Sequence, residues 1–148
     1  MKIYFLFFSS FLLITSLMYA QDIQTKIDDF PKEAMQIQNK EIARLVAKEI
    51  STSLPQDVDQ YTQLTAITTK DTTLIYTFEI DIGPKSDQSV MNEDKTRMKA
   101  AVTEGVCQSS HKFLEAGINT SYEYINAKSK VPLFEFHITQ QSCPQFSR

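Results

Sequence analysis

One stretch decides the fold: Thr73-Leu74-Ile75-Tyr76-Thr77-Phe78-Glu79-Ile80-Asp81-Ile82. Every second residue from Leu74 onward is large and apolar, and Thr, Glu or Asp fill most of the positions between them. In a strand, successive side chains point to opposite faces of the sheet. The pattern therefore predicts a strand with one apolar and one mostly polar face, which Gly83 and Pro84 end.

The same period of two predicts three more strands. A Thr-rich run at residues 61–68 precedes the first strand across a turn at residues 69–71, which makes a hairpin. Residues 120–125 and 131–139 form a second hairpin around the loop 126–130.

Two helices are predicted, one before each hairpin. Apolar residues recur at threes and fours within residues 31–53, and Pro55 follows the end of this run. The second helix is expected to begin near Ser89 or Asn92 and to stop at Gly117, a left-handed terminator. The order α-β-β-α-β-β predicts an α+β fold, in which a four-stranded antiparallel sheet of two hairpins has both helices packed on one face.

The first twenty residues read as a secretory signal peptide. Residues 1–20 contain the basic Lys2, an apolar run and the small Ala20 at the exit. An uncleaved membrane anchor is the alternative, because the run is nearly long enough to span a bilayer and Met18 stands where cleavage prefers a small residue. Hydroxyl residues within the run favour cleavage. We therefore expect a periplasmic protein whose mature part, residues 21–148, is one domain.

The charge of the chain argues against two classes of partner. Removing residues 1–20 takes away Lys2 and no acid, so the formal net charge falls from −3 to −4. Nucleic-acid binding needs basic residues that neutralise phosphates, and this mildly acidic chain has no basic run. It also lacks a basic amphipathic face for anionic membranes.

Two cysteines, Cys107 and Cys143, lie in the mature part. An even number of cysteines in an exported protein predicts a disulfide. The alternative is a zinc site that adds His111 and His137 as ligands. The spacings match no common zinc finger, and oxidising compartments convert thiols into disulfides, so we predict the disulfide and no metal.

No catalytic residues are predicted, and no cofactor. Ser109 and Ser110 adjoin His111, but neighbours along a helix do not face each other. A Gly-x-Ser-x-Gly elbow is absent from the sequence, and its three glycines are too scattered for a phosphate loop. The sequence therefore favours a protein without enzymatic activity.

The sheet face without helices is the predicted partner-binding surface. Apolar residues alternate there with Thr and Glu, a mixture typical of modest protein-binding surfaces. The aromatic residues of the strands are instead interpreted as core. The candidate partner-binding residues are Ile75, Glu123, Ile125, Val131, Leu133 and Glu135.

The last third of the chain carries a series of short motifs: Val106-Cys107, Phe113-Leu114-x-x-Gly117-Ile118, Tyr122-x-Tyr124, Phe134-x-Phe136-x-Ile138 and Cys143. This series resembles small disulfide-containing periplasmic proteins of Gram-negative bacteria, many of them uncharacterised. The resemblance implies a compartment, a disulfide and a fold, and it transfers no catalytic residue. Pilotin-like secretion accessories are also small exported domains, but this chain departs from them because no cysteine near the signal exit offers a lipidation site.

The leading functional hypothesis is a non-enzymatic periplasmic accessory that binds another cell-envelope protein. One alternative is an inhibitor or immunity protein for a cell-wall hydrolase, which would act through the loops at residues 83–88 and 126–130. A carrier of a small ligand is a further alternative, and it requires a sizeable pocket. The sequence does not identify the partner or predict the oligomeric state.

Overall fold

The computed structural model describes residues 31–144. The chain divides into two compact units, residues 1–35 and 36–148, and the description below concerns the second. The predictions of a signal peptide or a membrane anchor at residues 1–20 lie outside the described residues. None of the helices within residues 31–144 is long and apolar enough to cross a bilayer.

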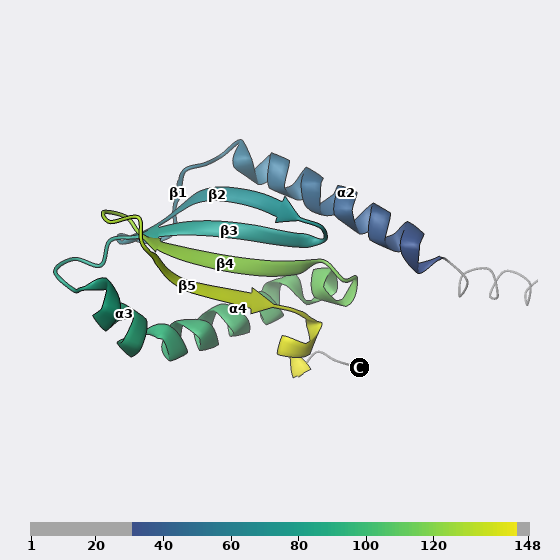
Figure 1. The fold of residues 1–148 in the computed structure, drawn as a ribbon. Coiled ribbons are helices and arrows are strands. Elements are labelled where there is room, and N and C mark those ends of the chain that lie inside the picture. The colour runs from purple at the N-terminus through teal and green to yellow at the C-terminus, as the bar shows by residue number, and fades with distance from the viewer. Residues whose placement is uncertain (1–30, 145–148) are drawn as a thin grey trace, which may run out of the picture. The chain divides into compact units, whose positions relative to one another are not determined.

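The sheet has five strands in the order β1-β2-β3-β4-β5 (Figure 1). Neighbouring strands are antiparallel except for β3 and β4, which run parallel. The strands are β1 (Gln56–Asp57), β2 (Thr62–Lys70), β3 (Thr73–Ile80), β4 (Asn119–Asn126) and β5 (Pro132–Ile138).

The predicted four-stranded antiparallel sheet is wrong. Within residues 31–144 the order is α-β-β-β-α-α-β-β, and the sheet is mixed. The extra strand β1 is only two residues long, so it carries no alternating pattern. The chain leaves β3 and returns to β4 through two helices, and such a crossover is the connection that parallel strands need.

The helices are α2 (Lys32–Ser51), α3 (Asp87–Glu93) and α4 (Lys95–Glu115), and the short 3₁₀ helix η1 spans Gln140–Ser142. Where one helix was predicted after the first hairpin, α3 and α4 meet at Asp94. The hydroxyl of Ser86 accepts a hydrogen bond from the backbone N–H of Ser89 and so caps the start of α3. Gly117 follows α4 with a φ of +86°, the left-handed conformation expected of a helix terminator.

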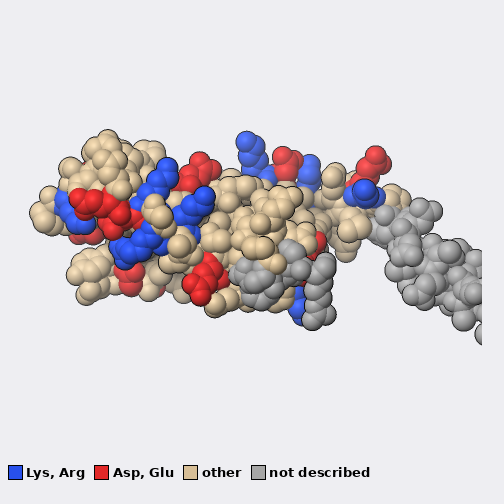
Figure 2. Space-filling view, turned by 90° about the horizontal axis from the view of Figure 1, so that it is seen from below, with Lys and Arg blue, Asp and Glu red and all other residues tan. Residues whose placement is uncertain are grey.

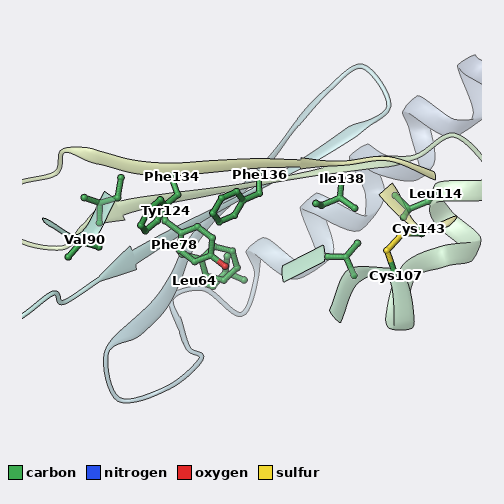
Figure 3. Packing of buried hydrophobic residues seen from close by; sticks show 12 residues of the cluster. Leu64, Phe78, Val90, Cys107, Leu114, Tyr124, Phe134, Phe136, Ile138 and Cys143 are labelled. Carbon is green, nitrogen blue, oxygen red and sulfur yellow. A yellow bond between two sulfur atoms is a disulfide. The ribbon is translucent and has the colours of Figure 1, made fainter. Parts of the chain in front are cut away.

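The core lies on one face of the sheet, under the two long helices. Small Ala43 and Ala47 of α2 pack against Ile67, Leu74 and Ile118. The inward residues of α4 and the disulfide pack with the aromatic side chains of the strands, as Figure 3 shows for Phe78, Tyr124, Phe134 and Phe136 at one end and Leu114, Cys107 and Cys143 at the other. We call this side of the sheet the covered face. The opposite side, the bare face, carries the alternate residues that pair with one another across β3, β4 and β5: Ile75, Thr77, Glu79, Ser121, Glu123, Ile125, Glu135 and His137.

A bulge in β5 changes the alternation of its side chains. Tyr124 pairs with Phe134 and Ile125 pairs with Pro132, so Leu133 has no partner on β4. Leu133 is 6% exposed and its neighbour Phe134 is 5% exposed, because both join the core. The predicted place of Leu133 on the bare face is therefore wrong, since a bulge puts two successive side chains on one side of a strand.

Cys107 of α4 and Cys143, which follows η1, form a disulfide, as predicted. Their Cα atoms are 5.5 Å apart, and both residues are at most 2% exposed. The two sulfurs are bonded to each other, so they are not the thiolate ligands that the zinc alternative requires. No group of three or more His, Cys, Asp or Glu side chains within residues 31–144 is placed to hold a metal.

Candidate functional site

A pocket of about 390 Å³ opens on the covered face where the loop after β1, the start of β2 and the end of β3 meet the junction of α3 and α4. We call it the helix-side pocket. It is lined by Asp59, Tyr61, Thr62, Ile80, Asp81, Ile82, Lys85, Val90, Asp94, Arg97 and Met98.

The loop that forms one wall of this pocket is held by backbone hydrogen bonds. The N–H of Val58 donates to the carbonyl of Thr62 at 2.9 Å, and the N–H of Asp81 donates to the carbonyl of Tyr61 at 2.8 Å. The Asp59 carboxylate accepts from the N–H of Tyr61 at 2.8 Å, an Asx turn. Val58 and Tyr61 are nevertheless 58% and 60% exposed, so a fixed loop presents two large apolar side chains to solvent.

The floor of the helix-side pocket is apolar and its rim is charged. Val90 is buried, and Ile80, Ile82 and Met98 are partly buried against the core. At the rim, Asp94 pairs with Arg97 at 2.8 Å, and the hydrogen bond from this guanidinium lowers the pKa of the Asp94 carboxyl. An apolar floor with a few placed polar groups is the usual construction of a binding site.

Charges of both signs surround this region. Lys85 pairs with Glu93 at 3.2 Å, and Lys128 of the β4–β5 loop pairs with Asp81 at 3.2 Å. Bonds from the N–H of Gly83 and from Lys128 lower the pKa of the Asp81 carboxyl. Figure 2 shows acidic and basic side chains mixed at the end of the molecule where α3 lies. Asp81, Glu93 and Asp94 are therefore ionised at neutral pH and paired with basic side chains, which suits a protein partner better than a strongly charged ligand.

Next to the pocket, aromatic rings stack across β3 and β4, and we call them the aromatic strip. Tyr76 stacks on Tyr122 with ring centroids 5.0 Å apart, and Phe78 stacks on Tyr124 at 4.9 Å. Partly buried residues pack beside the strip: Ile50 of α2, Leu54 of the segment that follows α2, and Met98 and Val102 of α4. Tyr76 and Tyr122 are themselves only partly buried, so the strip is not fully covered by the described residues.

Burial sets the acidity of the strip. Desolvation raises the pKa of the phenols of Tyr76 and Tyr122, and it raises the pKa of Tyr124 to about 12, with the nearby Asp59 carboxylate adding to the effect. These hydroxyls therefore stay neutral hydrogen-bonding groups throughout the physiological pH range.

The raised pKa values of these phenols predict a dependence of stability on pH. The strip phenols hold their protons more tightly in the folded chain than at the unfolded value near 10. Their contribution to stability is complete below pH 10 and should be lost as the pH rises from 10 toward 12. In an alkaline titration, the buried tyrosines should ionise only as the protein unfolds, so part of the tyrosinate absorbance should appear together with the loss of the near-ultraviolet circular dichroism. Tyr124→Phe should make this late rise in absorbance smaller. Ionisation of Tyr76, Tyr122 and Tyr124 around pH 10 in the folded protein would contradict the burial of the strip.

One hollow at the bare face is lined by four of the six predicted partner-binding residues, three from the bare face and one from the core. Glu123, Ile125, Leu133 and Glu135 line one hollow of about 370 Å³, and Leu133 reaches it although it belongs to the core. The lining is completed by Tyr124, Pro132 and Phe134. The other two predicted residues lie outside the lining: Ile75 is partly buried on β3, and Val131, just before β5, is 39% exposed.

The two loops predicted for an inhibitor are bonded to each other. Buried Asn126 donates through its side-chain amide to the Asp87 carboxylate, and Ser129 donates to the same carboxylate at 3.1 Å. The side-chain oxygen of Asn126 accepts from the N–H of Lys128 at 2.8 Å. The β4–β5 loop is therefore held against the start of α3, next to the helix-side pocket.

The helix-side pocket was not predicted from the sequence. Its lining comes from residues 59–62, 80–85, 90 and 94–98, which are brought together only by the fold. The one local signal was apolar Val58 and Tyr61 in an otherwise polar loop, and exposed apolar residues of that kind occur singly on most proteins.

No family model and no curated protein matches the sequence. Three solved bacterial structures resemble the chain, with TM-scores between 0.57 and 0.65. One is a Pseudomonas aeruginosa protein described as secreted. It is 18% identical to this chain, the match covers 74% of this chain and 96% of the Pseudomonas chain, and the TM-score is 0.65.

The other two structures are type II secretion system pilotins. The pilotin of Vibrio vulnificus is 15% identical over 75% of this chain and 96% of its own, with a TM-score of 0.61. The pilotin of Vibrio cholerae is 16% identical over 77% of this chain and all of its own, with a TM-score of 0.57. At such identities the likeness concerns the fold alone, and the chain therefore shares its fold with a protein described as secreted and with two secretion-system pilotins.

Proposed function

We propose that this chain is an exported, non-enzymatic accessory protein that works in the periplasm and binds another cell-envelope protein. Two of the proteins that share its fold are pilotins of secretion systems, so we propose a component of an envelope secretion machinery as the partner. Shared fold alone does not carry function, and the binding surface must supply the argument.

The observation that carries the proposal is the helix-side pocket. It combines a partly open apolar floor with a fixed loop that presents Val58 and Tyr61 to solvent. Aromatic side chains with a large apolar area and few rotatable bonds are favoured anchors of protein interfaces. The adjoining aromatic strip extends this apolar surface toward α2 and α4.

The residues of the helix-side pocket indicate which side chains of a partner would fit it. Ile80, Ile82 and Met98 offer contacts to a Leu, Met or Phe side chain of the partner. Among residues 31–144, Asp59 is the pocket carboxylate without a Lys or Arg ion pair, since Asp81 and Asp94 each have one. A basic residue next to the apolar anchor of the partner would therefore meet Asp59 at the rim.

The proposal is tested by site-specific photocross-linking in the native host. A benzoylphenylalanine at position 61 should form an adduct with one envelope protein. The same group at position 37, where Ile37 of α2 is 70% exposed, should not. Met98→Asp should abolish the adduct because it places a charge on the apolar floor.

Ala100→Asp is the matched control, since it adds the same charge to α4 at an exposed position. It should leave the adduct unchanged, and circular dichroism should show that both variants are folded. An adduct from position 61 that survives Met98→Asp, or equal adducts from positions 61 and 37, would contradict binding through the helix-side pocket.

A further inference from the structure

The bare face has features of a second docking surface, separate from the helix-side pocket. Within residues 31–144 both long helices pack on the other side of the sheet, where the core clusters lie. The hollow of about 370 Å³ lies across β4 and β5, between Glu123, Ile125 and Glu135. Ile125 is partly buried, so the hollow has an apolar wall as well as acidic ones.

The two glutamates face each other across the strands. Glu123 pairs with Glu135 in the register of β4 and β5, an arrangement that brings like charges close together and costs stability. Among the described residues neither has an ion pair with Lys or Arg. Glu135 accepts one hydrogen bond, from the Ser121 hydroxyl at 3.2 Å, and that bond does not neutralise it.

The lysines closest along the chain are engaged elsewhere. Lys130 pairs with Glu79 at 2.8 Å, and Lys128 pairs with Asp81 at 3.2 Å. The fold therefore neutralises the acids of β3 and of the segment after it, and leaves the pair on β4 and β5 unmatched. Two carboxylates are too few for a calcium site, which takes six to eight oxygens.

We propose that the bare face binds a basic segment of a partner protein. An Arg or Lys side chain lies between Glu123 and Glu135, and a neighbouring apolar side chain packs against Ile125. A guanidinium suits this position because its five N–H donors can reach two carboxylates at once. The contact also removes the repulsion between the two glutamates, so binding stabilises the sheet.

The proposal is tested by NMR titration of the complete, isotopically labelled chain with a short peptide. The probe is acetyl-Leu-Arg-Leu-Arg-Leu-amide, and the control peptide has Gln in place of both Arg residues. The Arg peptide should shift the amide signals of residues 121–125 and 133–137, and added salt should weaken the effect. The Gln peptide should bind at least about tenfold more weakly, because it cannot form the charge-assisted hydrogen bonds.

Matched variants separate binding from folding. The double variant Glu123→Gln with Glu135→Gln should bind the Arg peptide at least about tenfold more weakly than the native protein. Its melting temperature should be equal or higher, because the repulsion between the two carboxylates is gone. The control, Glu49→Gln with Glu115→Gln, removes the same charge from exposed helix positions and should leave peptide binding unchanged. Equal binding of both peptides, equal loss in both double variants, or shifts outside the bare face would overturn the proposal.

Discussion

Replacing both cysteines, Cys107→Ser with Cys143→Ser, is expected to lower the free energy of unfolding by about 3–4 kcal/mol. The two residues are 36 positions apart, and a cross-link over such a loop removes much of the conformational entropy of the unfolded chain. Both sulfurs also belong to the core, so the variant buries two hydroxyls in an apolar cluster. The loss is a large share of the 5–15 kcal/mol that is usual for a small domain.

The expected measurement is a drop in melting temperature of about 10–15 °C, followed by circular dichroism. Reduction of the native protein should produce the same drop, and thiol alkylation seen by mass spectrometry should occur only after reduction. Ser109→Ala, an exposed change on the same helix, should stay within about 0.5 kcal/mol. A double variant as stable as the native protein would show that the disulfide contributes nothing to the fold.

The disulfide also makes the stability of the fold depend on the compartment in which the protein is found. It joins α4 to the segment after η1, so the end of the described chain is held against the helix that covers β5. Such a bond forms and persists in an oxidising compartment and is rare in the cytoplasm. The proposed periplasmic function would therefore coincide with the place where the fold is most stable.

The alternating stretch that ends at Ile82 predicts β3 well, because a half-buried strand leaves a period of two in the sequence. The same pattern does not predict whether the neighbouring strand runs parallel or antiparallel. The pairing of β3 with β4 is parallel because α3 and α4 carry the chain back along the sheet, and alternation looks the same in either direction. The short strand β1 has too few residues to show any pattern.

The candidate surfaces differ in how far sequence could identify them. Alternation along β4 and β5 correctly placed Glu123, Ile125 and Glu135 near one another on the bare face, because each follows the period of its strand. The helix-side pocket could not be predicted, since its lining is assembled from distant segments. Leu133 was misplaced because a bulge shifts the side on which a residue points, and this sequence gives no clear signal for it.

Leu133→Asp is the substitution with the largest expected effect. Leu133 is 6% exposed and packs in the core, so an aspartate there loses the buried methyl groups and leaves a carboxylate without a partner. We expect the free energy of unfolding to fall by about 4 kcal/mol or more, enough to unfold a large part of the population. Val131→Asp should cost less than about 1 kcal/mol, because Val131 is 39% exposed.

Urea denaturation of the two variants decides between two arrangements of β5. If strict alternation held, Leu133 would lie beside Glu135 on the bare face, and aspartate would be tolerated at position 133 as well as at position 131. A large loss at position 133 alone follows from the bulge, whereas equal small losses would exclude it. The result also governs how binding experiments are interpreted: loss of a partner in Leu133→Asp would report unfolding, and only the glutamine variants of Glu123 and Glu135 test the bare face itself.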